Sequence, residues 1–317
     1  MGGLGGVLGL RGGNRPPRGL RHQLIYDDRW FQQLMVLPMQ LIIWAVLVVP
    51  LLIALYLSFV DWQPISGLEW WQAPFAGIEN YRRAILDPRF QSAIVRTVIF
   101  VGAVVSVEFL LGLALAVLFN RKFPARRALS SLLLFPMMLP WVVVGLIFFL
   151  VFLEKGPVNY LLRVGFGPAA SVDWFGRPLL ALFTIGLGDV WQWTPFMFLV
   201  IYSALAAVPP EPVEAARTLG ASDWQIFRRV TLPSIKPVIL IALLIRALEA
   251  FKIFDLVFIM TGGGPGTSTE SVSLYLYRTG FVFGQLSFAS AAAILLLALV
   301  LVVSWLGLRP LRRELEL

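Results

Sequence analysis

The sequence lacks cysteine entirely and contains a single histidine, His22, among its 317 residues. Disulfides, thiolate nucleophiles and cysteine-based metal sites are therefore excluded, and His22 lies in a polar N-terminal tail, where a solvated surface position is expected. The motifs Gly-x-Ser-x-Gly, His-Glu-x-x-His and Gly-x-x-x-x-Gly-Lys-Ser/Thr are also missing. These absences argue against an enzyme, and they predict that the chain holds no metal or cofactor and does not itself bind ATP.

Charged residues are scarce, at 14% of the chain, whereas hydrophobic residues make up 58%. Soluble domains carry about 25% charged residues, so the composition indicates an integral membrane protein. The net charge of +8 would suggest nucleic-acid binding in a soluble protein. In a membrane protein basic residues collect on cytoplasmic loops instead, and we expect no nucleic-acid partner.

Six apolar runs are each long enough to cross about 30 Å of hydrocarbon as a helix. We therefore predict an all-α integral membrane protein with six transmembrane helices. A disordered tail (1–30) precedes the membrane domain (31–309), and a short tail (310–317) follows it. The segment 157–167 is too short to span and is expected at the surface. The predicted spans are 34–59, 94–119, 132–153, 179–208, 238–260 and 288–308.

Lysine and arginine are distributed unevenly between the two sides of this topology. Sixteen of the 26 lie in the N-terminal tail, the second-to-third and fourth-to-fifth connections and the C-terminus, and seven lie in the other connections. Because basic residues favour the cytoplasmic side, the count predicts that both termini and the loop 209–237 are cytoplasmic.

Charged side chains occur inside three of the predicted spans, where each costs about 2.5 to 3.5 kcal/mol at the centre of the membrane. The fifth span carries Arg246, Glu249, Lys252 and Asp255, whose signs alternate at a spacing that lets neighbours pair along a helix. Two interpretations remain open: an ion-pair ladder that holds helices together, or the polar lining of a substrate path. Glu108 in the second span is interpreted as a lone, structural acid.

The fourth span combines aromatic and hydrogen-bonding side chains around Pro195. This proline is expected to kink the helix, and the carbonyls that it frees are tolerated only beside protein or a water-filled cavity. Flat aromatic faces with polar groups nearby suit a sugar or polyol, whereas the alternative is an ordinary interfacial tryptophan belt. The residues concerned are Asp189, Trp191, Gln192, Trp193 and Phe196.

The loop 209–237 is polar and helix-competent, although it lies between two apolar spans. Three prolines open it, which suits the first turn of a helix, and Gly220 allows a turn between two short helices. The second helix is amphipathic, and Pro233 is expected to end it. Such a pair is either a helix in the headgroup plane or a docking helix for a cytosolic partner.

The residue pattern of this loop resembles the coupling loop of binding-protein-dependent ABC importers. Glu-Ala-Ala is followed after three residues by Gly-Ala, and later by Leu-Pro and a further Pro, over 24 residues. The resemblance extends over most of the chain and is to permease subunits of carbohydrate importers of the maltose, trehalose, glycerol-phosphate and polyol type. The matching positions are Glu214, Ala215, Ala216, Gly220, Ala221, Leu232, Pro233 and Pro237.

This resemblance implies a type I ABC importer permease fold in a prokaryotic plasma membrane. A sugar or polyol would be delivered by an extracytoplasmic binding protein. Two cytosolic ATPase subunits would bind ATP and Mg, and a second permease, expected to be a different chain, would complete the path. Substrate contacts would fall at Trp191, Gln192, Trp193, Phe196, Glu249, Lys252 and Asp255. The alternative is an ATP-independent channel or a scaffolding subunit, distinguished by whether solute uptake requires ATP hydrolysis.

The predicted orientation can be tested at Ser222, because a cysteine placed there is the only thiol in the chain. We expect Ser222→Cys to resist an impermeant thiol reagent in intact cells and to react once the membrane is permeabilised, since the basic loop is predicted to face the cytoplasm. Labelling of intact cells would contradict this topology.

Overall fold

The computed structural model describes residues 28–121 and 123–315. These residues form two compact units, which divide between Ile53 and Ala54. Most of the expected N-terminal tail, including His22, lies outside the described residues. The first unit comprises α2 (Asp28–Ile43), the π-helical segment η1 (Trp44–Val48) and the start of α3 (Val49–Ser58).

The second unit is built from helices and short connections, with a single β-bridge between Val60 and Phe75 among its described residues. Its C-terminal helix continues into the expected tail. In chain order the elements after α3 are η2 (Pro64–Ser66), η3 (Trp70–Gln72), α4 (Glu79–Leu86), α5 (Pro88–Phe119), α6 (Arg126–Leu134), η4 (Phe135–Met138), α7 (Trp141–Phe152), α8 (Pro157–Phe166), α9 (Pro178–Ala206), α10 (Pro210–Thr218), α11 (Asp223–Ile226), η5 (Phe227–Thr231), α12 (Leu232–Phe251), α13 (Asp255–Met260), α14 (Val272–Tyr277), η6 (Arg278–Val282) and α15 (Leu286–Leu315).

Each of the six predicted spans has a helical counterpart. Within residues 28–121 and 123–315, five helical stretches are long and apolar enough to cross a membrane, and α9 makes a sixth when it is taken together with α10, to which it is bent by 69°. The six-helix membrane fold is therefore confirmed. The five stretches are Met35–Ser58, Pro88–Phe119, Trp141–Phe166, Asp223–Phe251 and Leu286–Arg309.

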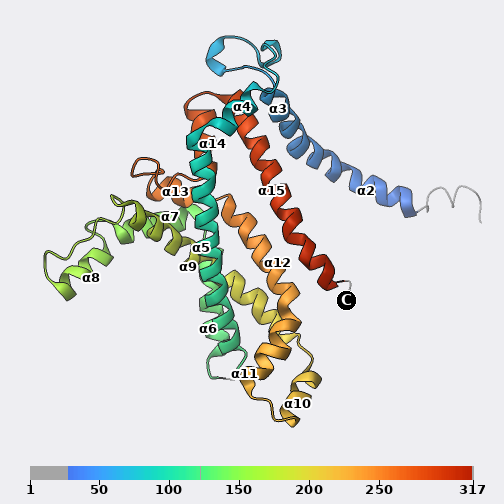
Figure 1. Cartoon of the computed structure of the whole chain (residues 1–317), viewed down its shortest axis with the longest axis vertical. Helices are drawn as coiled ribbons and strands as arrows, with labels where there is room; N and C mark the ends of the chain where they lie inside the picture. The colour runs from blue at the N-terminus through green and yellow to red at the C-terminus, as the bar shows by residue number, and fades with distance from the viewer. Residues whose placement is uncertain (1–27, 122, 316–317) are drawn as a thin grey trace, which may run out of the picture. The chain divides into compact units, whose positions relative to one another are not determined.

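The centre of the second unit is formed by α5, α9 and α12, which pack against one another (Figure 1). Asp87 caps α5: its side chain accepts from the Phe90 N–H at 2.8 Å, and Pro88 occupies the first turn. Buried residues such as Phe198 on α9 and Ile235 on α12 fill the space between the three helices. A long, rigid α5 thus provides the surface on which the other two are positioned.

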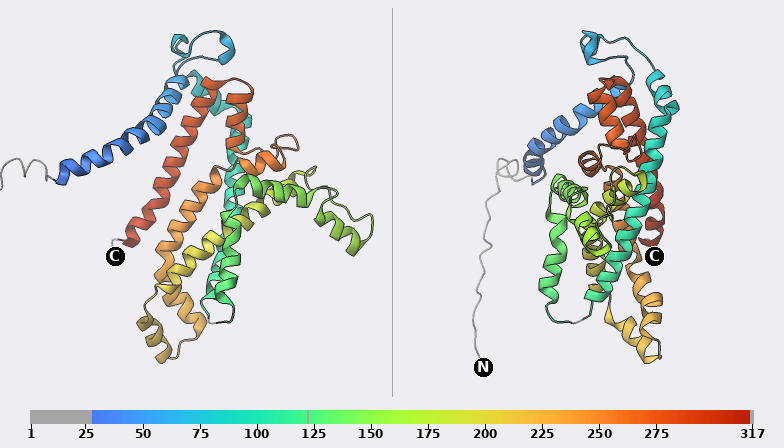
Figure 2. Two further views of the ribbon diagram at one scale, coloured as in Figure 1. Left: turned by 180° about the vertical axis from the view of Figure 1, so that it is seen from behind. Right: turned by 90° about the vertical axis from the view of Figure 1, so that its left-hand side faces the viewer.

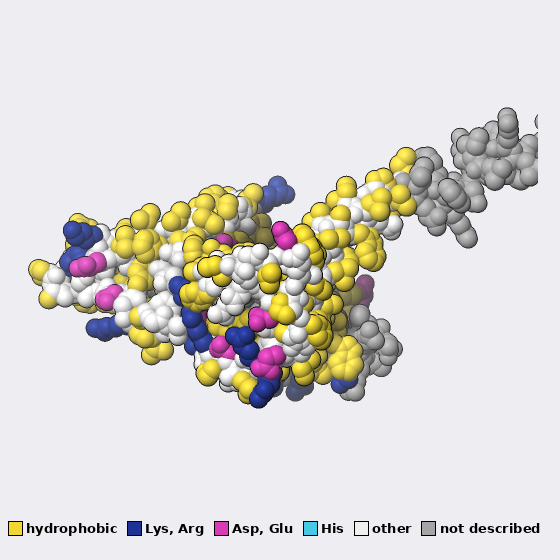
Figure 3. Space-filling view, turned by 90° about the horizontal axis from the view of Figure 1, so that it is seen from above, with side chains coloured by type: hydrophobic (Ala, Val, Ile, Leu, Met, Phe, Trp, Pro, Cys, Tyr) yellow, Lys and Arg dark blue, Asp and Glu magenta, His cyan; other side chains and the backbone are white. Residues whose placement is uncertain are grey.

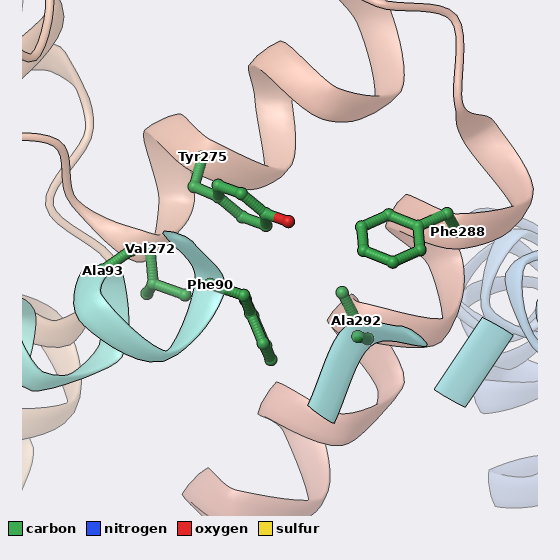
Figure 4. Close-up of a cluster of buried hydrophobic side chains, with 7 residues drawn as sticks. Phe90, Ala93, Val272, Tyr275, Phe288 and Ala292 are labelled. Atoms are coloured by element: carbon green, nitrogen blue, oxygen red, sulfur yellow. The ribbon is translucent and has the colours of Figure 1, made fainter. Parts of the chain in front are cut away.

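The two ends of the second unit differ in character. The turn between α10 and α11 lies at one end, and α4 and α14 lie at the other (Figures 1 and 2). Seen from the α4 end, acidic and basic side chains are intermixed among hydrophobic ones (Figure 3). Beneath this surface, Phe90, Val272, Tyr275 and Phe288 from α5, α14 and α15 form a buried apolar cluster (Figure 4).

The third predicted span, 132–153, is not one continuous helix. A short 3₁₀ segment, η4, separates α6 from α7, and Leu139 is extended with φ −80° and ψ 140°. Pro136 and Pro140 explain the break, because each lacks an N–H for the helical ladder and disfavours helical backbone in the residue before it.

Unlike Pro136 and Pro140, Pro233 does not interrupt its helix. The prediction that Pro233 ends the second loop helix is therefore wrong. The helix continues from α11 through the π-helical segment η5 into α12, and the Leu232 N–H donates to the Phe227 carbonyl, five residues back. The wider π turn makes room for the proline ring, which would otherwise clash with the preceding turn. Pro195 also lies inside a helix, since α9 continues past it as an α-helix.

The fifth predicted span, 238–260, breaks after Phe251. The last turn of α12 tightens: the Lys252 N–H donates to the Glu249 carbonyl, and the Ile253 N–H to that of Ala250. The carbonyl of Ile253, which the break releases from the ladder, accepts a hydrogen bond from Ser271 Oγ at 2.7 Å. A partner distant in sequence therefore stabilises a break that neither glycine nor proline marks.

Candidate functional site

Three charged side chains from three helices meet inside the second unit. Arg246 on α12 donates through Nε to Glu108 Oε2 at 2.7 Å and through Nη2 to Glu108 Oε1 at 2.8 Å. The same Nη2 also donates to Asp189 Oδ2 on α9. All three side chains are fully buried. Because two-point arginine–carboxylate contacts are strong and directional, this triad ties α5, α9 and α12 together at one place.

The triad corrects two expectations. Glu108 is not a lone acid, and Arg246 does not pair with Glu249 along its own helix. Three residues advance a helix by 300°, so Glu249 is turned about 60° from Arg246. Glu249 instead pairs with Lys252 at 2.9 Å, with 40% and 67% of the two side chains exposed. Pairing along the helix is therefore present for Glu249 and Lys252 and absent for Arg246, whose ion pairs join three helices instead.

Trp193 lies directly beside the triad. The guanidinium carbon of Arg246 is 4.9 Å from the centre of its indole ring, a cation–π arrangement. Ring centres of Trp141 on α7 and Phe196 on α9 lie 5.5 and 5.9 Å from that of Trp193. Trp141, Trp193 and Phe196 are called the aromatic wall below. Its central ring, Trp193, is positioned by the buried guanidinium of Arg246.

Three consecutive residues of α9 carry buried polar atoms that have no hydrogen-bond partner within the described part of the chain. They are Gln192 Oε1, Trp193 Nε1 and Thr194 Oγ1. Gln192 is held in place through its Nε2, which donates to the Leu139 carbonyl at 2.8 Å. A buried polar group without a partner costs about 1–3 kcal/mol, so this turn is suited to hydrogen-bonding water or a hydroxyl-bearing ligand.

The other predicted path residues are placed differently. Trp191 packs on Phe148 of α7, with ring centres 5.7 Å apart. Asp255 begins α13, beyond the break, and no ion pair joins it to Lys252 in the described residues. The structure therefore places Trp193 against Arg246 and Phe196 against Trp193. Gln192 bonds to Leu139, and the Glu249–Lys252 pair lies at the end of α12.

The predicted turn at Gly220 is confirmed. Gly220 has φ +82°, a conformation that glycine adopts at little cost. The Gly220 N–H donates to the Arg217 carbonyl at 2.9 Å, and the Ala221 N–H donates to that of Ala216 at 3.0 Å. This pair of bonds is the Schellman arrangement that ends a helix through a left-handed residue.

The second helix of the loop starts immediately after this turn. Ser222 and Gln225 form a reciprocal capping box, which satisfies two free N–H groups at the start of α11. Ile226 is buried and anchors the loop, whereas Leu219 and Trp224 are 88% and 67% exposed. Glu214 and Ala215 are exposed, Ala216, Ala221 and Leu232 are half-buried, and Pro233 is exposed. A rigid turn with protruding apolar side chains is suited to docking into a groove.

One buried ionic cluster had no counterpart among the predicted site residues. Glu270, which is fully buried between α13 and α14, accepts from Arg89 Nε and Nη2 at 2.8 and 2.7 Å and from Arg278 Nη1 at 3.1 Å. Glu270 and Arg89 are 181 positions apart in the sequence. Only their opposite charge could have signalled the pair, and every Arg–Glu pair in the chain shares that signal.

Comparisons with known proteins agree on one family. Residues 108–309 match the model described as "Binding-protein-dependent transport system inner membrane component". This region starts at Glu108 and contains the triad and the α10–α11 turn.

Two curated relatives match along nearly their whole length. The trehalose/maltose transport system permease protein MalF of Thermococcus litoralis is 33% identical, over 89% of this chain and 94% of the relative. The sulfoquinovosyl glycerol transport system permease protein SmoG of Agrobacterium fabrum is 36% identical, over 90% and 92%. Among solved structures, a bacterial ABC transporter involved in alginate import matches with TM-score 0.78 at 23% identity, covering 92% of this chain and 99% of that chain. That likeness establishes the fold.

The triad predicts a large stability cost when one partner alone is removed. Arg246→Ala leaves two buried carboxylates facing each other without their cation, and we expect a loss of about 3–5 kcal/mol, measured as a lower melting temperature of the detergent-solubilised protein. Replacing all three charges (Arg246→Met, Glu108→Gln, Asp189→Asn) should recover much of this loss. Lys252→Ala, which removes an exposed pair, is the matched control. A melting temperature of Arg246→Ala equal to that of the wild type would contradict the role of the triad.

Proposed function

The chain belongs to the family of binding-protein-dependent transport system inner membrane components, and from this premise we propose that it is the transmembrane subunit of an ATP-driven importer for a sugar or polyol. It forms part of the translocation path, receives the solute from an extracytoplasmic binding protein and is coupled to a separate ATPase. Relatives named for trehalose and maltose transport support the solute class.

The observation that carries the solute class is the turn Gln192 to Thr194. It offers an amide oxygen, an indole N–H and a hydroxyl, all buried and without partners among the described residues. The rings of Trp193 and Phe196 adjoin these groups. A sugar has hydroxyls at its rim and C–H groups on its faces, so Gln192 and Trp193, about 100° apart on α9, can serve both, whereas Thr194 is turned about 200° from Gln192. Asp189 Oδ1 and Arg246 Nη1, in the neighbouring triad, are also buried without partners among the described residues.

The Glu249–Lys252 pair supports an entry position. In the proposed orientation α12 runs from the cytoplasm outward, so this pair lies about one turn closer to the outer side than Arg246. Both side chains are partly exposed. A solute released outside would meet these polar groups before it reaches Trp193. Trp191 and Asp255 remain candidate path residues, which a second permease would complete. We propose that this second permease is a different chain.

The α10–α11 turn supports the coupling role. Glu214, Ala215 and Ala216 precede the rigid turn at Gly220, and Ala221 follows it, so small residues leave the backbone open to close approach. We place this loop in a groove on a cytosolic ATPase, of which two copies supply ATP and Mg binding. Leu232 and Pro233 continue the helix from the docking loop into the membrane. The protein is accordingly placed in a prokaryotic plasma membrane with both termini in the cytoplasm.

The solute path is tested by substitutions of α9 in vesicles that contain the complete complex. Trp193→Ala removes an aromatic contact worth roughly 1–1.5 kcal/mol, so we expect uptake of a transported neutral sugar at subsaturating concentration to fall by roughly five- to tenfold. Glu249→Ala should also reduce uptake. Leu199→Ala, an exposed residue of the same helix, is the control. Unchanged uptake in both path variants of an assembled complex would exclude this path.

The coupling role is tested at Gly220. A Cβ built there meets no atom within 4 Å, so the cost of Gly220→Val comes from its φ of +82° alone, about 1–3 kcal/mol. We expect the variant to insert and to dock with the binding protein, but to lose the ATPase stimulation caused by loaded binding protein in reconstituted vesicles. Gly220→Asn, which tolerates this conformation, should retain most of it. Wild-type stimulation and uptake in Gly220→Val would refute the coupling role.

A further inference from the structure

An apolar groove with a volume of about 430 Å³ runs between α5 and α9. Its walls include Phe100, Ala103 and Val107 from α5 and Phe183, Gly186 and Leu187 from α9. Among the residues that line it, only Arg96 is charged. The groove is separate from the proposed solute path, since Trp193, Phe196 and the charges of the triad do not line it.

The groove has the length of one membrane leaflet. Residues 96–107 of α5 rise by about 16 Å, which is about half of the roughly 30 Å hydrocarbon core. It also begins near the starts of both helices, because Leu179, close to the N-terminus of α9, lines it together with Arg96. It ends next to Glu108 and Asp189, whose depth along the two helices places them near the middle of the bilayer. In the proposed orientation Arg96 lies at the outer surface.

The charge of Arg96 is not neutralised by an acid of its own. Its nearest acid, Glu270, is already bound by Arg89 and Arg278. Arg96 reaches only the backbone carbonyl of Glu270, through Nε at 3.3 Å, and its Nη2 is buried without a partner among residues 28–121 and 123–315. Two guanidinium groups thus bind the one carboxylate, and the positive charge of Arg96 is left over at the end of the groove.

The lining of the groove indicates an apolar occupant with a negative charge at one end. Eleven of the twelve residues that line it are uncharged, and the one charged residue, Arg96, lies at its outer end. A single acyl chain matches the apolar lining, and a phosphate at its head complements Arg96.

We propose that this groove binds one acyl chain of an anionic phospholipid of the outer leaflet, with its phosphate at Arg96. The proposal rests on the membrane location and orientation of the chain and not on the solute path. Lipid in this position would fill the seam between α5 and α9, the two helices that carry Glu108 and Asp189.

The test is native mass spectrometry of the full chain, with any subunits that co-purify, titrated with phosphatidylglycerol and with phosphatidylcholine of the same chain length. For the wild type we expect one bound phosphatidylglycerol, held roughly tenfold more tightly than phosphatidylcholine. Arg96→Gln should abolish this preference, and Arg96→Lys should keep it. Ala103→Phe, which fills the groove, should weaken binding of both lipids. Val98→Phe is the matched control, since Val98 is exposed on α5 and does not line the groove.

Equal binding of the two lipids by the wild type would overturn the proposal, as would unchanged lipid binding in Ala103→Phe. If Arg96→Gln fails to fold, the comparison of Ala103→Phe with Val98→Phe decides alone. A photo-crosslinking residue at Val107 gives an independent readout in the membrane. Crosslinks to phospholipid support the site, and crosslinks to another protein subunit would assign the groove to a subunit contact and refute it.

Discussion

The contact of Arg246 with Glu108 and Asp189 is the interaction on which the centre of this molecule depends. Three charges removed from water carry a large desolvation cost, and only close, directional contacts offset it. Here the two-point bond to Glu108, the bond to Asp189 and the face of Trp193 surround a guanidinium that is wholly buried. Because the partners come from α5, α9 and α12, the relative depth and rotation of these helices must satisfy one geometry. The aromatic wall and the unpaired polar turn of α9 are positioned by that geometry.

The features that could be predicted from the sequence are those encoded locally. Apolar runs identify the six spans, and a glycine between two helix-forming stretches identifies the turn at Gly220. The break after Phe251 could not be predicted, because the hydrogen bond that stabilises it comes from Ser271. The pairing of Glu108 with Arg246 depends on how α5 and α12 are rotated toward each other. The alternation of charge along α12 alone does not indicate that rotation. For the same reason the aromatic cluster at Trp193 was foreseeable as a group of residues, whereas its contact with Arg246 was not.

Two regions with different demands share one helix. The α10–α11 turn has a backbone held by the Schellman bonds, the capping box and the buried Ile226, and it leaves apolar side chains exposed. The interior needs a polar surface that is held in place within an apolar medium, which the triad provides. Residues Asp223–Phe251 form one helical stretch that connects the two. This stretch therefore joins the α10–α11 turn to Arg246, which contacts Trp193.

The π-helical segment η5 also sets how far the side chains of α12 are rotated about the helix axis relative to those of α11. A π turn contains one more residue than the α turn it replaces, and each residue of an α-helix corresponds to about 100° of rotation. With the extra residue at Phe227–Thr231, Arg246 faces Glu108 while Ile226 remains buried on the loop side. The number of residues in η5 therefore determines the direction in which the side chains of α12 point. Homologues that gained or lost a residue here would need a compensating change before Arg246, or their interior charges would face a different neighbour.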